Sequence, residues 1–143
     1  MVDIKTLDGV LIECKSWTIG APAFVNFKNG TSGSFGQFLS YLQNGVTNMN
    51  GLEYWFDSKK ESSESALKGE FKSMMYQNNA LTTQGDAVFN AIWGNTGLRG
   101  NLFPETVGFS SEELEDEKDN YRKDFLEMIS SLDNPFYEFI KVR

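Results

Sequence analysis

Two acids and one lysine near the start of the sequence are the residues best suited to chemistry. Asp3 is followed by Glu13, and Lys15 stands two positions after Glu13. Two carboxylates held close together repel each other, and a divalent cation between them relieves that conflict. Oxygen donors select a hard cation, and Mg²⁺ is commonly held by one or two carboxylates together with waters and substrate phosphates. A lysine beside such an ion could orient a water or neutralise charge that builds on a phosphate.

The elements that must position these residues begin with a predicted β-hairpin. Alternating runs over 2–6 and 10–15 flank Leu7-Asp8-Gly9, and Asp-Gly between such runs is a strong hairpin signal. A two-residue loop would mix polar and apolar side chains on both faces. A three-residue loop with Gly9 in the left-handed conformation pairs Ile4 with Ile12 and separates the two kinds of side chain.

The three-residue loop also assigns the reactive side chains to one face of the hairpin. It places Asp3 opposite Glu13, and Lys15 shares the face of Glu13 because it follows by two positions. We expect the other face, which carries the apolar side chains and Cys14, to be the buried one. Cys14 is the single cysteine of the chain, so it forms no internal disulfide and no cysteine zinc cluster. We interpret it as a buried small hydrophobe rather than a reactive thiol.

The amino-acid composition excludes most other kinds of catalytic and metal-binding site. The chain of 143 residues contains no histidine, which excludes histidine-based nucleophilic systems and histidine metal ligands. No run of residues approaches the length and apolarity of a membrane span, and the beginning of the sequence has no signal-peptide pattern, so we expect a soluble protein. The net charge is −7, but residues 1–75 are nearly neutral, with seven lysines against eight acids. The objection that an acidic chain binds nucleic acid poorly is therefore weaker for this part of the chain.

Hydrophobic spacing predicts the remaining elements of a single α+β domain with an α/β-like core, in which a small mixed sheet of about four strands is packed by about four helices. Its parts are a core motif region over 2–56, a helical region over 59–132 and a final strand over 136–142. Within them we expect helices over 34–44, 59–78, 83–93 and 110–132, a strand over 52–56, and loops over 17–36 and 94–108, the first with an edge strand at 23–27. Ser110 and Glu113 predict a capping box at the start of the last helix.

Asp3 and the string Gly9-Val-Leu-Ile-Glu-Cys-Lys15 resemble the D…(D/E)-x-K signature of the restriction-endonuclease-like PD-(D/E)xK nuclease superfamily. The stretch 11–17 is especially similar to the nuclease domains at the carboxyl ends of bacterial polymorphic toxins. The resemblance covers about residues 2–56. It implies that Asp3 and Glu13 bind the metal and that Lys15 acts with them in catalysis. Many members carry a glutamine on the following helix with a tyrosine one turn later, and Gln37 and Tyr41 match that pattern, which implies a supporting catalytic role for Gln37.

The resemblance implies an Mg²⁺- or Mn²⁺-dependent endonuclease that hydrolyses phosphodiester bonds, with DNA favoured over RNA as the substrate. It also implies a cognate immunity protein, and export as part of a larger toxin that acts in the cytoplasm of a target cell. A second hypothesis is a non-catalytic acidic interaction or immunity-like protein. On that hypothesis, Asp3 and Glu13 belong to a solvated strand face, and residues 110–131, which contain the acidic run 112–117, meet a basic surface of the partner.

Overall fold

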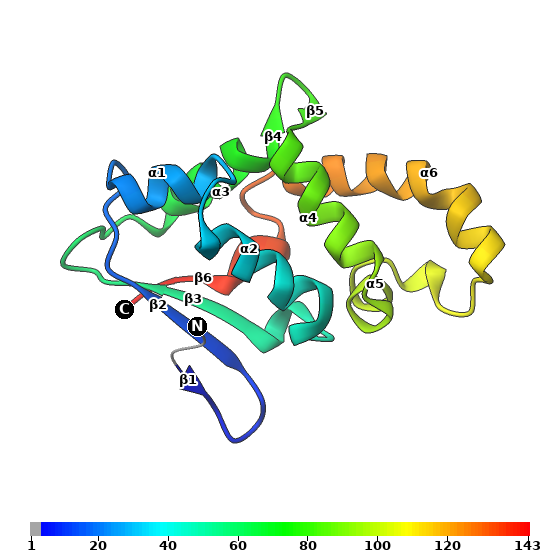
Figure 1. The fold of residues 1–143 in the computed structure, drawn as a ribbon, viewed down its shortest axis with the longest axis horizontal. Helices are drawn as coiled ribbons and strands as arrows, with labels where there is room; N and C mark the ends of the chain where they lie inside the picture. Colours follow the sequence, from blue (N-terminus) through cyan, green and yellow to red (C-terminus); the bar gives the residue numbers. More distant parts are fainter. Residues whose placement is uncertain (1–3) are drawn as a thin grey trace.

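The sheet of the molecule has four strands, of which the first two form the predicted hairpin. The computed structural model describes residues 4–143. Strand β1 (Ile4–Lys5) pairs antiparallel with β2 (Leu11–Lys15), β2 pairs parallel with β3 (Leu52–Phe56), and β3 pairs parallel with β6 (Ile140–Val142) (Figure 1). The predicted α+β class, with a small mixed sheet that begins with a hairpin, is confirmed.

The hairpin has the predicted register. Ile4 lies opposite Ile12, and the Thr6 amide donates to the Val10 carbonyl oxygen at 2.9 Å. Gly9 has a φ of +89°, the left-handed conformation that a three-residue loop of this kind requires. The pairing of Asp3 with Glu13 lies outside the described residues.

The prediction for which face of the hairpin is buried is wrong. Ile4 is 44% exposed and Cys14 is also exposed, whereas Glu13 is buried. The cause is the parallel neighbour β3, whose fully buried residues Leu52, Tyr54 and Phe56 face the same side as Glu13. The helices cover that side of the sheet because it offers the larger apolar surface. Ile12 is buried on the opposite side.

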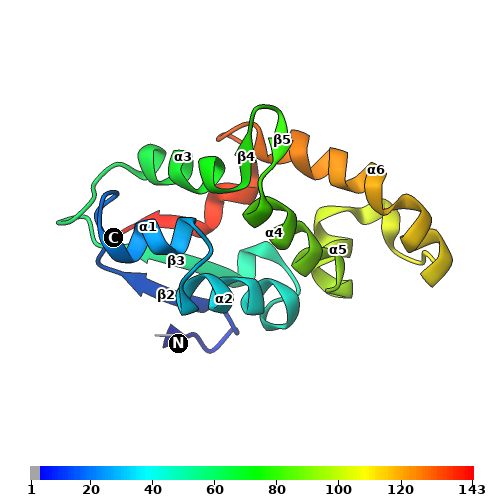
Figure 2. The same cartoon turned by 45° about the horizontal axis from the view of Figure 1, so that its top comes forward.

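Three helices lie over this face of the sheet: α1 (Pro22–Lys28), α2 (Gly33–Ser40) and α3 (Glu64–Met75) (Figure 2). The helix predicted over 34–44 is confirmed as α2 and the π-helical segment Tyr41–Gly45 that continues it. The loop and edge strand predicted around 23–27 are wrong, since this stretch is α1. Proline is favoured in the first helical turn, and the spacing of the buried Phe24 and Phe27 suits a helix better than a strand.

The second half of the chain lies mostly to one side of the sheet. A short hairpin of β4 (Tyr76–Gln77) and β5 (Ala80–Leu81) leads into α4 (Thr83–Trp93), followed by α5 (Thr96–Leu102) and α6 (Ser111–Ile129) (Figure 1). The capping box of Ser110 and Glu113 is present as predicted. The described residues thus hold six α-helices rather than about four, because two short helices, α1 and α5, lie in segments predicted as loops.

Short 3-10 segments complete the chain at Met49–Gly51, Pro104–Thr106 and Pro135–Phe139. The last of these replaces most of the strand predicted over 136–142, of which Ile140–Val142 alone joins the sheet. None of the helices in residues 4–143 is long and apolar enough to cross a membrane.

The contact between α3 and α4 generates a prediction about two glycines. A Cβ atom on Gly85 would lie 2.1 Å from the Met75 carbonyl oxygen, whereas one on Gly69 would meet nothing within 4 Å. We expect Gly85→Ala to lower the free energy of unfolding by about 2–3 kcal/mol through overpacking. Gly69→Ala should raise it by about 0.5–1 kcal/mol because alanine is the better helix former. Urea unfolding of both variants measures this, and equal effects would contradict the close helix contact.

Candidate functional site

Glu13 and Lys15 lie together on β2 beneath the helices, with Tyr41 as a third member of the group. The Lys15 ammonium Nζ lies 3.2 Å from Glu13 Oε1, and the Tyr41 hydroxyl donates to Glu13 Oε2 at 2.8 Å. Glu13 is 3% exposed and the Lys15 side chain is 12% exposed. The carboxylate thus has a partner on each of its two oxygens and almost no contact with solvent.

Tyr41 reaches the strand because α2 changes its hydrogen-bonding pattern at this residue. Tyr41 begins the π-helical segment, and the Val46 amide donates back to the Tyr41 carbonyl oxygen at 3.0 Å. The buried Asn95 side chain secures the end of this segment, because its Nδ2 donates to the carbonyl oxygens of Leu42 at 2.7 Å and Val46 at 2.6 Å. Short π-helical turns are found frequently at functional sites, where they redirect a side chain.

The Lys15 ammonium is held between a carboxylate and an aromatic ring. Its Nζ lies 4.7 Å from the centroid of the Trp17 ring, a cation–π contact. Trp17 in turn stacks on Phe24 of α1 at a centroid distance of 5.4 Å. The helix that sequence patterns did not predict therefore helps to place the lysine.

Tyr54 of β3 is the strand neighbour of Glu13 and is not among the predicted site residues. It is the register partner of Glu13 across the parallel strands, so both side chains point toward the helices. Burial raises the pKa of the Tyr54 phenol far above its usual range, and the negative charge of Glu13 and the neighbouring Tyr41 add to the effect. The density of aromatic residues in 52–56 predicts the strand, but the parallel register that pairs Tyr54 with Glu13 depends on the helices that connect β2 to β3.

The predicted site residues are thus partly brought together. Glu13 and Lys15 are in contact, whereas Asp3 lies outside the described residues, so the predicted metal pair of Asp3 and Glu13 stays a prediction. Gln37 is half-buried on α2, and its carbonyl oxygen accepts a hydrogen bond from the Tyr41 amide, one turn later. Within residues 4–143, no hydrogen bond joins the Gln37 side chain to this group, and no three acidic or cysteine side chains gather as a metal cluster.

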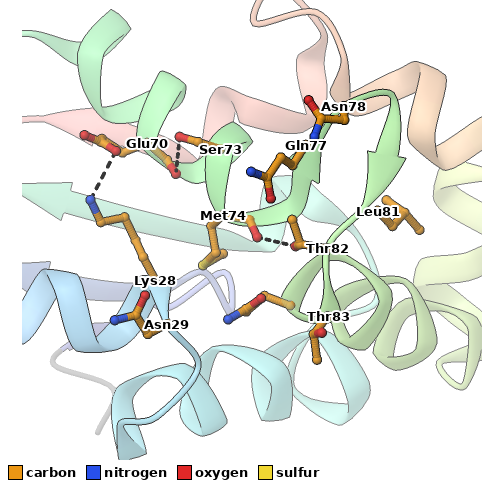
Figure 3. A pocket seen from close by; sticks show the side chains of 11 residues that line it. Lys28, Asn29, Glu70, Ser73, Met74, Gln77, Asn78, Leu81, Thr82 and Thr83 are labelled. Carbon is orange, nitrogen blue, oxygen red and sulfur yellow. Dashed lines mark hydrogen bonds and ion pairs between the residues drawn. The ribbon is translucent and has the colours of Figure 1, made fainter.

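A larger pocket, formed by described residues, lies elsewhere in the molecule. It has a volume of about 670 Å³, is lined by α1, α3 and the β4–β5 hairpin, and shares no residue with the Glu13 group (Figure 3). Lys28 and Glu70 form an ion pair of 3.1 Å at its wall. A smaller pocket of about 300 Å³ lies where the parallel strands β2 and β3 end, and Lys15 lines it together with Trp55, Asp57 and Arg143. The carboxyl ends of parallel strands are where α/β folds commonly bind ligands, so we give the smaller pocket more weight.

Comparison of the chain with protein-family models, with curated proteins and with solved structures found no match in any of the three.

The buried ion pair generates a prediction about stability. Lys15→Met leaves the Glu13 carboxylate without its cation, and we expect the free energy of unfolding to fall by about 3 kcal/mol. The double variant Glu13→Gln/Lys15→Met removes both charges and should recover most of that loss. Lys68→Met serves as the control, because Lys68 and Glu64 form an i,i+4 pair on α3 in which the Glu64 side chain is 44% exposed, and such a helix pair contributes about 0.3–0.5 kcal/mol. Urea unfolding of the three variants measures the differences, and equal losses in both single variants would contradict the account.

Proposed function

We propose that the protein is a metal-dependent nuclease in which Glu13 and Lys15 belong to the catalytic site. The observation that carries this proposal is the burial of the Glu13 carboxylate between the Lys15 ammonium and the Tyr41 hydroxyl. An ion pair on a solvated strand face would show most of its surface to water. This pair instead lies in the interior, where taking charges out of water is costly and the pair adds little to stability. Locally unfavourable arrangements of this kind are expected chiefly at functional sites.

The contact between Tyr41 and Glu13 further supports the resemblance to PD-(D/E)xK nucleases. The glutamine and tyrosine positions of that pattern are Gln37 and Tyr41, which stand one turn apart. Tyr41 donates directly to the acid of the E-x-K string at 2.8 Å. Gln37 stays a proposed supporting residue.

The donor set suits a hard divalent cation. Glu13 supplies carboxylate oxygen, and Asp3 is the residue proposed to supply a second one, the ligand type that Mg²⁺ and Mn²⁺ prefer. When bound, the metal would lower the pKa of a water and offset charge on the scissile phosphate. The protein's own contributions are to hold the Glu13 carboxylate with Tyr41 and to supply the Lys15 ammonium for the phosphate or the attacking water. For Lys15 to act there, its ammonium must leave Glu13 Oε1.

The biological setting that we propose follows from the same resemblance. The substrate is nucleic acid, with DNA favoured over RNA, and the enzyme is a toxin domain exported within a larger protein to act in the cytoplasm of a target cell. A cognate immunity protein neutralises it. The pocket at the ends of β2 and β3 is lined by Lys15, Trp55 and Arg143, and the Arg143 guanidinium lies over the Trp55 ring at 5.6 Å, a combination of cation and aromatic ring suited to nucleic acid.

A non-catalytic interaction protein is the competing proposal, and the acidic face of α6 favours it. Glu112, Glu113, Glu115 and Asp116 are exposed on that helix and available to a basic partner. The two proposals differ in their response to metal. A ligand that binds the folded state raises the melting temperature, so an Mg²⁺-induced increase that Asp3→Asn abolishes would favour the nuclease.

Glu13→Gln provides the direct test of the nuclease proposal because it keeps the shape of the side chain and removes its charge. We expect Mg²⁺-dependent cleavage of plasmid DNA or RNA to fall by more than about 100-fold, since even outer-shell partners of a metal contribute up to that much. Glu53→Gln is the matched control. Glu53 lies on β3, alternates with the buried residues of that strand, and accepts a hydrogen bond from Trp55 Nε1 at 2.7 Å.

We expect the Glu53→Gln variant to cleave at the rate of the unmodified protein. Equal activity of the Glu13→Gln variant and the unmodified protein would overturn the proposal. Absence of cleavage by the unmodified protein with Mg²⁺ and with Mn²⁺, on DNA and on RNA, would overturn it as well.

A further inference from the structure

Among residues 4–143, the buried Tyr54 hydroxyl has no hydrogen-bond acceptor. Among the described residues, two buried side-chain polar atoms lack a hydrogen-bond partner, the Tyr54 hydroxyl oxygen and Arg99 Nε. Buried polar groups are almost always paired, so each exception calls for an explanation. Arg99 Nη1 already donates to the Trp93 carbonyl oxygen at 2.6 Å. The Tyr54 side chain has one polar group, and no described residue forms a hydrogen bond with it.

The position of Tyr54 relates this hydroxyl to Glu13. The two residues are register partners on neighbouring parallel strands, and their side chains point to the same face of the sheet. The Tyr54 ring is fixed by edge contacts with Phe38 at a centroid distance of 5.5 Å and with Phe139 at 5.9 Å. A ring held in this way keeps its hydroxyl in place, whereas the Glu13 side chain has more torsional freedom to move.

The chemistry proposed for Lys15 creates a need for a second donor. Lys15 Nζ forms an ion pair with Glu13 Oε1 at 3.2 Å, and the Tyr41 hydroxyl donates a hydrogen bond to Oε2. When the ammonium turns toward a phosphate or a water, Glu13 loses one of its two partners inside the protein. The metal ion proposed for this site would take one carboxylate oxygen, and ligating carboxylates are themselves held in place by hydrogen bonds from the protein, so a second protein donor keeps Glu13 oriented as the ammonium leaves.

We propose that Tyr54 is a positioning residue. Its hydroxyl replaces the Lys15 ammonium as a hydrogen-bond donor to the Glu13 carboxylate when the ammonium moves away. In this exchange the Tyr54 hydroxyl donates to the Glu13 carboxylate, which keeps two protein donors as the ammonium turns to the substrate. No proton is transferred and no covalent bond changes. The catalytic role of this exchange rests on the proposed nuclease function. The exchange of hydrogen bonds itself can be measured without any substrate.

A double-mutant cycle between Lys15 and Tyr54 tests the exchange. Tyr54→Phe in the unmodified protein should leave the urea midpoint unchanged or raise it, because the hydroxyl that is lost had no partner. The same change in a Lys15→Met background should lower the midpoint, because there the hydroxyl is bound to Glu13. Lys15→Leu gives the same test with a different apolar side chain if the methionine variant does not fold.

Tyr137→Phe is the matched control for the loss of a buried tyrosine hydroxyl. Tyr137 is fully buried, and its hydroxyl donates to the Ile129 carbonyl oxygen at 2.6 Å. This variant should lower the urea midpoint equally in the unmodified protein and in the Lys15→Met background. An effect of Tyr54→Phe that is the same in both backgrounds would overturn the exchange, as would a loss in the unmodified protein as large as that of Tyr137→Phe.

Cleavage assays separate this inference from the proposed function. If the exchange serves catalysis, Tyr54→Phe should reduce the rate constant of Mg²⁺-dependent cleavage about tenfold or more while the folded protein stays as stable as before. Normal cleavage by a stable Tyr54→Phe variant would overturn the positioning role and leave the nuclease proposal standing. If the effect of Tyr54→Phe on stability depends on Lys15 but the protein cleaves no nucleic acid, the exchange is supported and the nuclease proposal is overturned.

Discussion

The carboxylate of Glu13 must remain partnered inside the protein, and much of the surrounding structure meets that requirement. Its oxygens are held by the Lys15 ammonium and the Tyr41 hydroxyl. Each of these partners depends on a different helix, since Trp17 and α1 place the lysine while α2 places the tyrosine. Burying this carboxylate is unfavourable, and its ion pair adds little to the free energy of unfolding. This is the main reason to regard β2 as the candidate site.

The one-sided sheet gives the site its rigidity. β3 contributes Leu52, Tyr54 and Phe56 to the covered face, and Phe71 of α3 packs edge-on against Tyr54 and Phe56 at centroid distances of 6.2 Å. Aromatic rings in such contacts fix one another's orientation more closely than aliphatic side chains do. On the far side of α2, Asn95 ties the end of the π-helical segment to the second half of the chain. Phe71 and Asn95, which are distant in the sequence, thus support the packing around Glu13 and Lys15.

The sequence allowed the local structure to be predicted well where a single element carried the signal. The hairpin register followed from alternation and from Gly9, and the capping box at Ser110 followed from spacing. Burial of Glu13 could not be predicted in this way, because it depends on which face of β2 the helices cover, and the parallel neighbour β3 decides that. Cys14 was assigned to the wrong environment for the same reason. The roles of Tyr41 and Tyr54 depend in the same way on contacts across strands and helices that local patterns do not encode.

The short helices α1 and α5 were missed because their sequences resemble loops. α1 begins with Pro22 in a stretch rich in glycine and asparagine, and α5 contains two glycines. Such residues have low helix propensity, and it is tertiary packing of Phe24, Phe27 and Leu98 that stabilises these helices. The missed helix α1 matters for the candidate site, since Phe24 supports the Trp17 ring over which the Lys15 ammonium lies.

The most direct test of the central claim is a crystal structure with Mn²⁺, which stands in for Mg²⁺ and has a strong anomalous signal. The account predicts an anomalous peak within coordination distance of a Glu13 carboxylate oxygen, with the Lys15 ammonium withdrawn from that carboxylate. A structure at saturating Mn²⁺ with no peak beside Glu13 and with the Lys15–Glu13 ion pair intact would contradict it.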